Sequence, residues 1–146
     1  MARRTYANQK GFTLIEIMVV VVILGILATF IAPRLLDRPD EARRTKATLD
    51  IKALEEALGL FKLDNGYFPS TEQGLQALVV KPVTGRIPSK YPEDGYVKKI
   101  PLDPWNGEYV YLSPGVHDNF DIICLGADGE VGGEGKDADI NSWELE

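Results

Sequence analysis

The chain has 146 residues, a length that suits one domain with one attached element. Its formal net charge is −6, and because Arg3, Arg4 and Lys10 all precede Gly11, the residues after Gly11 carry −9. This acidity argues against a nucleic-acid-binding surface, which needs clustered Lys and Arg. A single cysteine excludes an intrachain disulfide, and a single histidine excludes a metal site built from several histidines.

Residues 12–32 form an apolar run with one charged member, Glu16. As a helix this run is about 31 Å long at 1.5 Å per residue, close to the roughly 30 Å hydrocarbon core of a bilayer. Positive charge lies only before the run, so the positive-inside rule predicts a cytoplasmic N-terminus and an exported remainder. A secretory signal would be cleaved after its apolar region, and no Ala-x-Ala motif follows here. Hydropathy alone therefore predicts an uncleaved single-pass anchor.

Glu16 indicates more than an anchor. A carboxylate at the bilayer centre costs roughly 2.5–3.5 kcal/mol, so an acid inside a membrane segment is expected to have a partner and a function. If the bond after Gly11 is cut, Phe12 gains an α-amino group four residues from Glu16. The amine of a neighbouring chain can neutralise the carboxylate where the dielectric constant is low. Pairing between subunits then gives a rule for self-assembly.

The stretch KGFTLIE, which ends at Glu16, resembles the processing motif of the type IV prepilin-like family. The resemblance implies that a prepilin peptidase cuts between Gly11 and Phe12 and methylates the new N-terminal phenylalanine. It also implies that Glu16 acts in subunit assembly. Residues 1–11 are then a cleaved leader, and residues 12–32 are a transmembrane and assembly helix.

Residues 33–64 are predicted to form a periplasmic amphipathic helix. Apolar residues recur at i, i+4, i+7, i+11 and i+14, while charged residues occupy the other face. Pro33 and Pro39 are expected to kink or break the helix, and Asn65-Gly66 is expected to end it. The apolar stripe is expected to pack on a C-terminal sheet, and it consists of Ala47, Ile51, Leu54, Leu58 and Phe61.

Residues 65–146 are predicted to form a small globular domain. Ser70 and Gln73 have the spacing of a capping box, which predicts a short helix over residues 71–80. A short extended piece is expected near residues 97–100. Two alternating runs, GEYVYLS and FDIICLG, are about ten residues apart and predict neighbouring antiparallel strands. With the long helix packed across these strands, the predicted fold class is α+β.

The stretch LGADGEVGGEGKDADINSWELE combines clustered acids with five glycines. Glycines allow a tight loop, and carboxylates together with exposed carbonyls are the hard oxygen ligands that suit Ca²⁺. The spacing is not that of an EF-hand. A solvated acidic loop is the alternative interpretation, although without a cation its acids would repel one another.

Three longer stretches extend the resemblance. DNGYFPSTEQGLQAL, DPWNGEYVYLSPGVHDNFDI and LGADGEVGGEGKDADINSW are similar to segments of the major pseudopilins of type II secretion systems, which have a type IV pilin-like fold. The resemblance implies a calcium ion in the final loop. Trp143 is expected to close this loop over the core. The implied ligands are the side chains of Asp128, Asp137 and Asp139 and the backbone carbonyls of Leu125 and Val131.

The resemblance implies a structural subunit and not an enzyme. Such a subunit enters the bacterial inner membrane with its globular domain in the periplasm. It then polymerises into a periplasmic pseudopilus that drives folded proteins through an outer-membrane secretin. The implied partners are further copies of the chain, prepilin peptidase, minor pseudopilins, an inner-membrane assembly platform with its ATPase, and membrane lipid before assembly.

Two alternatives remain open. A type IV pilin, which forms an extracellular fibre for adhesion, motility or DNA uptake, shares the N-terminal motif, but many such pilins carry a C-terminal cysteine pair. A membrane-anchored periplasmic enzyme would use paired carboxylates placed across a cleft, for which Asp118 and Asp121 are candidates. The sequence contains no nucleophile elbow, phosphate loop or metal triad that supports the enzyme.

Overall fold

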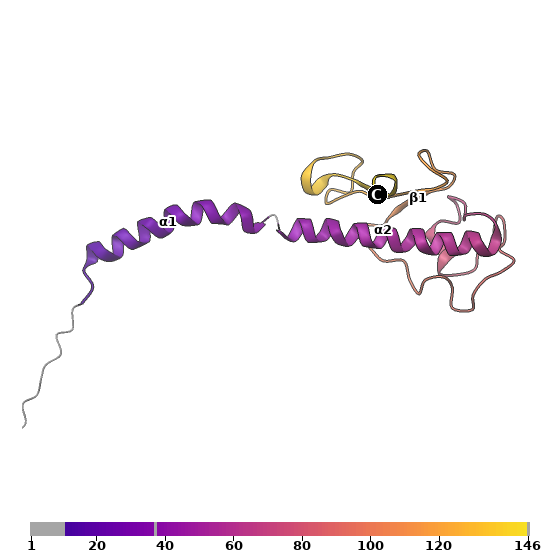
Figure 1. Cartoon of the computed structure of the whole chain (residues 1–146), viewed down its shortest axis with the longest axis horizontal. Coiled ribbons are helices and arrows are strands. Elements are labelled where there is room, and N and C mark those ends of the chain that lie inside the picture. The colour runs from indigo at the N-terminus through magenta and orange to yellow at the C-terminus, as the bar shows by residue number, and fades with distance from the viewer. Residues whose placement is uncertain (1–10, 37, 146) are drawn as a thin grey trace, which may run out of the picture. The chain divides into compact units, whose positions relative to one another are not determined.

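The computed structural model describes residues 11–36 and 38–145, and of residues 29–36 and 38 it describes the backbone alone. The chain divides into two compact units, Met1–Arg38 and Pro39–Glu146. The predicted leader lies outside the described residues apart from Gly11. The helical elements of the two units are drawn in Figure 1.

The first unit contains α1, which runs from Leu14 to Leu36. Thr13 begins the helix, because its hydroxyl and carbonyl oxygens lie 3.3 and 3.1 Å from the backbone nitrogen of Glu16, as expected of an N-cap threonine. Within the described part of the chain, no helix is long and apolar enough to cross a membrane. The predicted span of residues 12–32 includes side chains, from residue 29 onward, that are outside this part.

The helix α2 runs from Arg38 to Asn65, and from Pro39 onward it belongs to the second unit. The helix α1 continues through Pro33 to Leu36, four residues past the end of the predicted segment 12–32. A proline removes one hydrogen bond and bends a helix without obliging it to end. Pro39 is the second residue of α2, in the first turn where a missing N–H costs nothing.

The predicted end of α2 is confirmed. The helix stops at Asn65, and Gly66 has a φ of +80°, the left-handed conformation that glycine adopts without a Cβ penalty. The N–H of Gly66 donates to the carbonyl of Lys62 over 2.6 Å, which satisfies one of the last carbonyls of the helix.

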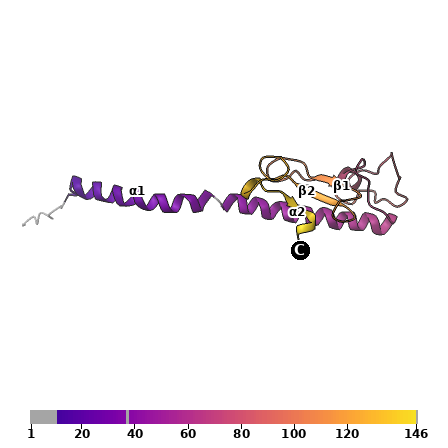
Figure 2. The same ribbon diagram turned by 90° about the horizontal axis from the view of Figure 1, so that it is seen from above.

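The predicted apolar stripe of α2 is the centre of the hydrophobic core. All five stripe residues are buried, and none is more than 2 % exposed. In Figures 1 and 2, α2 lies along the small sheet. The stripe residues belong to one core cluster with buried residues of the strands. Burying such side chains is the main favourable term in folding. The core residues that α2 contacts from other elements include Leu78, Tyr109, Tyr111, Ile122, Cys124 and Ile140.

The sheet has three short antiparallel strands in the order β1-β2-β3: Val110–Leu112, Asp121–Cys124 and Ile140–Asn141. The antiparallel pair predicted from the two alternating runs is confirmed, with Tyr111 opposite Ile122. The α+β fold class is therefore confirmed. The extended piece expected near residues 97–100 is wrong, since that segment forms no strand.

Polar contacts join β1 and Tyr109, the residue before it, to α2 and to the turn after α2. The hydroxyl of Tyr109 donates to Asp50 Oδ2 on α2 over 3.0 Å, and Lys46 pairs with the same oxygen. Burial, reinforced by this carboxylate, raises the pKa of Tyr109, so the phenol stays a donor. The hydroxyl of Tyr111 donates to the Pro69 carbonyl over 2.8 Å. Together these bonds fix the position of the strand along the helix.

The helix predicted over residues 71–80 is shorter than expected and is a 3₁₀ turn, η1, from Leu75 to Leu78. The capping box itself is present, because Gln73 N–H donates to Ser70 Oγ and Ser70 N–H donates to Gln73 Oε1. Gly74 follows with a φ of +60°, which no α-helix accommodates. The box therefore stabilises one turn and not a whole helix.

Candidate functional site

The cleavage site predicted between Gly11 and Phe12 lies in irregular backbone before α1. Phe12 is 78 % exposed, and a Cβ added to Gly11 would meet no atom within 4 Å. An exposed, non-helical peptide bond can enter the active site of a peptidase as an extended chain. This geometry suits processing at the predicted bond.

The residues after the cleavage site present an apolar surface with one acid. Each large apolar side chain from Leu14 to Leu27 is at least 47 % exposed. Glu16 lies in the first turn of α1, where its charge interacts favourably with the helix dipole. Within the described residues no basic side chain forms an ion pair with Glu16.

The second candidate site is the C-terminal loop, residues 125–139, whose backbone folds back and hydrogen-bonds to itself. Ala127 N–H donates to the carbonyl of Lys136 over 3.1 Å, and Asp139 N–H donates to the carbonyl of Gly132 over 3.2 Å. A Cβ on Gly126 or Gly133 would lie 2.5 Å from the Asp137 carbonyl oxygen. The glycines of the motif therefore permit a close backbone approach, as expected from the sequence.

The structure places the five predicted calcium ligands on this loop. Leu125 and Asp128 line one cavity of about 330 Å³, which they share with Asp103 and Trp105. The carboxylate of Asp128 accepts the N–H of Glu130, and that of Asp137 pairs with Lys136.

Two predicted ligands remain. Val131 has an exposed side chain, and Asp139 Oδ2 accepts the N–H of Gly132 over 2.9 Å. Nowhere in residues 11–36 and 38–145 do three or more His, Cys, Asp or Glu side chains form a group that could hold a metal. The loop thus brings the three aspartates onto one short segment without gathering their carboxylates around one point.

The donor chemistry of the loop fits calcium. Asp139 Oδ1 is buried and has no hydrogen-bond partner within the described structure, and such an acceptor is costly unless something binds it. Calcium accepts a mixture of carboxylates, backbone carbonyls and water, so three converging carboxylates are not required. The unpartnered Asp139 Oδ1 is an acceptor of the kind that a hard cation would bind.

Arg44 contacts this loop from α2, and the sequence did not single it out. Its Nη1 donates to the carbonyls of Gly135 and Ala138 over 3.2 and 2.8 Å. These partners lie 91 and 94 positions further along the chain. No local pattern separates Arg44 from the neighbouring Arg43, so only the tertiary fold identifies it.

Two family profiles match the chain. A profile described as "Type II secretion system (T2SS), protein G" matches residues 34–143, and one described as "Prokaryotic N-terminal methylation motif" matches residues 6–32. The chain belongs to the type II secretion system protein G family. The resemblance inferred from the N-terminal motif and the three longer stretches is therefore confirmed.

Relatives of this pseudopilin cover nearly all of it. "Type II secretion system core protein G" of Pseudomonas aeruginosa is 56 % identical over 137 residues, which are 94 % of this chain and 96 % of the relative. The protein of the same description from Vibrio cholerae is 55 % identical over 139 residues, which are 95 % and 94 % of the two chains.

A solved structure also matches the pseudopilin. The major pseudopilin from the type 2 secretion system of enterohaemorrhagic Escherichia coli is 43 % identical, with a TM-score of 0.69. The match covers 77 % of this chain and 92 % of that one. It confirms the predicted fold and the predicted function of a major pseudopilin.

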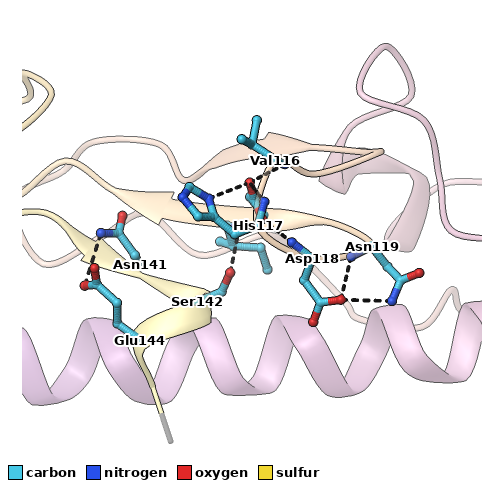
Figure 3. A network of polar contacts seen from close by, with 9 residues as sticks. Val116, His117, Asp118, Asn119, Asn141, Ser142 and Glu144 are labelled. Carbon is cyan, nitrogen blue, oxygen red and sulfur yellow. Dashed lines mark hydrogen bonds and ion pairs between the residues drawn. The ribbon is translucent and has the colours of Figure 1, made fainter.

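The two acids considered for an enzyme have structural roles in the pseudopilin. Asp121 is buried at the start of β2, and its carboxylate accepts the backbone N–H groups of Val116, His117 and Asp118 over 2.7 to 3.3 Å. Asp118 is exposed and accepts the N–H of Asn119 over 2.7 Å (Figure 3). Both carboxylates thus hold one turn together through backbone hydrogen bonds, which is a structural role.

Several hydrogen bonds set the charge of Asp121. Burial raises the pKa of its carboxyl. The hydrogen bonds from the N–H of Val116 and from the side chain and N–H of His117 lower the pKa by more than burial raises it, so the pKa lies below its ordinary value of 3.8. Asp121 is therefore ionised at neutral pH, and backbone N–H groups of the turn are its partners.

The sequence predicted that Trp143 closes the C-terminal loop over the core, but the structure places its ring elsewhere. It belongs to η3, Ser142–Glu144, and its ring stacks on that of His117 with centroids 3.8 Å apart and 11° between the planes. Ser142 Oγ accepts the N–H of Ile122 over 3.0 Å (Figure 3). These contacts fasten the end of the described chain to the Asp121 turn and not to the loop.

Proposed function

We propose that this pseudopilin is cleaved between Gly11 and Phe12 and methylated on Phe12. It is held in the bacterial inner membrane by residues 12–32, with its N-terminus cytoplasmic and its globular domain periplasmic. It then polymerises into a periplasmic pseudopilus that drives folded proteins through the outer-membrane secretin. The observation that carries this proposal is the surface of α1, which exposes apolar side chains around one acid, Glu16, that forms no ion pair with another described residue.

We infer self-assembly because α1 exposes its apolar side chains in a single subunit. Exposed apolar side chains favour burial against other helices, and a carboxylate in that environment favours an opposite charge. Cleavage supplies the charge, because Phe12 becomes the N-terminal amine. The Phe12 amine of one subunit pairs with Glu16 of its neighbour, and the pairing sets the register of the helices.

The remaining proposed partners act in the steps of cleavage, membrane residence and assembly. Prepilin peptidase recognises the basic leader and the Gly11–Phe12 bond, and membrane lipid covers α1 until assembly. An inner-membrane platform with its ATPase adds subunits at the base, and minor pseudopilins complete the fibre. The subunit performs no catalysis of its own, since the buried Asp121 organises a turn and is not placed for chemistry.

Calcium holds the C-terminal loop of the proposed subunit. The residues that would bind it are the side chains of Asp128, Asp137 and Asp139, with the backbone carbonyls of Leu125 and Val131. The ion supplies positive charge among acids that otherwise repel one another. The support for this site is the buried Asp139 Oδ1, which lacks a partner in the described structure.

A substitution at Glu16 tests the assembly step. We expect Glu16→Ala to leave membrane insertion and methylation of Phe12 unchanged, because neither uses the carboxylate, and to abolish fibre formation. N-terminal sequencing and mass spectrometry measure processing, and electron microscopy of overproduced fibres measures assembly. Glu93→Ala, which removes an acid from an exposed loop, serves as the control and should assemble normally.

Fibres of normal length from the Glu16→Ala chain would contradict the pairing of Glu16 with Phe12. Export is tested separately by deleting the gene. Loss of secreted hydrolases with normal surface pili supports the secretion function, whereas loss of pili with normal export supports the type IV pilin alternative.

A further inference from the structure

Arg44 links the start of α2 to the C-terminal loop. The side chain leaves the second turn of α2 and is half-buried, while its neighbour Arg43 points to solvent and pairs with Asp40 in the first turn. Both bonds of Arg44 come from Nη1, whose two hydrogens reach two different carbonyls. The guanidinium therefore acts as a two-point clamp on the loop backbone.

The two carbonyls that Arg44 binds enclose one turn. They belong to Gly135, the first residue of the 3₁₀ turn η2 (Gly135–Asp137), and to Ala138, the residue that follows the turn. Asp137 lies inside this bracket, and Asp139 comes directly after it. Any movement of the clamped backbone therefore moves two of the proposed calcium ligands.

We propose that Arg44 is a positioning residue for the calcium loop: it fixes the backbone of residues 135–138, and thereby couples calcium binding to the first turns of α2. The inference rests on the calcium site proposed above. A residue that orients the ligands of a metal without binding the metal itself typically changes metal affinity by about 10- to 100-fold when it is removed. Arg44 binds carbonyl oxygens, so it does not occupy a ligand carboxylate.

Charge and geometry predict opposite results at this position. Arg44 is a cation, and its Coulomb repulsion weakens calcium binding, so removing the charge alone should strengthen it. The clamp acts in the other direction, since the unclamped loop must be ordered when calcium binds. The acids of the loop and the Lys136–Asp137 pair are common to all the variants below, so the sign of the change decides between the two effects.

Three variants of the full-length chain in detergent micelles test the clamp by calorimetric titration with Ca²⁺. Arg44→Met keeps the aliphatic stem and removes both donors, so we expect calcium to bind about tenfold more weakly. Arg44→Lys retains several N–H donors on one nitrogen and should recover most of the affinity. Arg43→Met is the matched control, and it should bind calcium like the unsubstituted chain.

Melting curves separate positioning from simple stabilisation. If Arg44 only stabilises the fold, Arg44→Met lowers the melting temperature equally with calcium and with chelator, and the calcium affinity stays unchanged. If it positions the loop, the increase in melting temperature on adding calcium becomes smaller. Hydrogen exchange should also slow in residues 40–46 on adding calcium to the unsubstituted chain, and not in Arg44→Met.

Two results overturn the inference in distinguishable ways. Equal or tighter calcium binding by Arg44→Met, with normal binding by the unsubstituted chain, overturns the role of Arg44 alone. Failure of the unsubstituted chain to bind calcium overturns the calcium site and the role of Arg44 with it.

Discussion

Asp121 shows how one buried carboxylate organises a loop. Its side chain is almost completely buried, yet it accepts three consecutive backbone N–H groups, from Val116, His117 and Asp118. The carboxylate, which is itself buried, thus obtains hydrogen-bond partners from the backbone of the turn, as a buried charge requires. The ring stack of His117 on Trp143 depends on the same turn, so one residue fixes the contact between the turn and η3.

The stability of the pseudopilin should fall at acid pH because of Asp121. The pKa of this carboxyl is lower in the folded chain than its ordinary value of 3.8, so its contribution is fully present above that value and is lost as the pH falls through the folded pKa. Asp121→Asn should cost about 1–3 kcal/mol at pH 7 and flatten the acid limb of the stability curve. Urea unfolding from pH 7 to pH 2.5 measures both.

Asp118→Asn is the control for this prediction. Asp118 lies three residues earlier in the same turn but is exposed, and an asparagine oxygen can still accept the N–H of Asn119. Its stability curve should match that of the unsubstituted chain. An Asp121→Asn chain that is equally stable and equally acid-sensitive would show that the turn does not depend on the charge.

At the scale of the element, α2 has two faces that a matched pair of substitutions can separate. Leu58 is fully buried in the core, whereas Leu60 is 54 % exposed. Leu58→Ala should lower the free energy of unfolding by about 2–5 kcal/mol, since it removes buried apolar atoms and leaves a cavity. Leu60→Ala should change it by about 0.5 kcal/mol or less. Chemical denaturation of the detergent-solubilised monomer measures both, and equal effects would contradict the assignment of faces.

The elements that the sequence predicted correctly are those with local patterns. The spacing of Ile51, Leu58 and Phe61 repeats with the period of a helix, and Gly66 supplies a backbone conformation that ends it. β1 and β2 were found because their residues alternate. β3 was missed because a strand of two residues, Ile140–Asn141, has no period and exists only through its pairing with β2.

The candidate sites divide in the same way. The cleavage motif and the acidic glycine loop are continuous in sequence, so they could be predicted, and the structure describes Gly11, Phe12 and the loop at those positions. Arg44 could not be predicted, because its partners are remote in the chain and its neighbour has the same side chain. The predicted role of Trp143 was wrong for a similar reason: the partner of its ring, His117, comes from a distant turn.

Calcium should stabilise the whole globular unit and not the loop alone, because Arg44 connects the loop to α2 and β3 connects it to the sheet. At a free calcium concentration 100 times the dissociation constant, binding to the native state adds about 2.7 kcal/mol. For a domain of this size the melting temperature should rise on the order of 10 °C. Differential scanning calorimetry with calcium and with chelator measures the rise, Asp139→Asn should reduce it, and an identical melting temperature in both buffers would contradict the site.

The position of the core stripe on α2 has a consequence for biogenesis. Phe61 packs in a core that also contains Ile122, and those two positions are separated by about 60 residues, which a translating ribosome adds in roughly 3–12 s. During that interval the helix can form, but its apolar face has nothing to cover it. The emerging chain therefore exposes the apolar stripe of α2 for seconds, and we expect this interval to be the one in which the chain is most prone to aggregate.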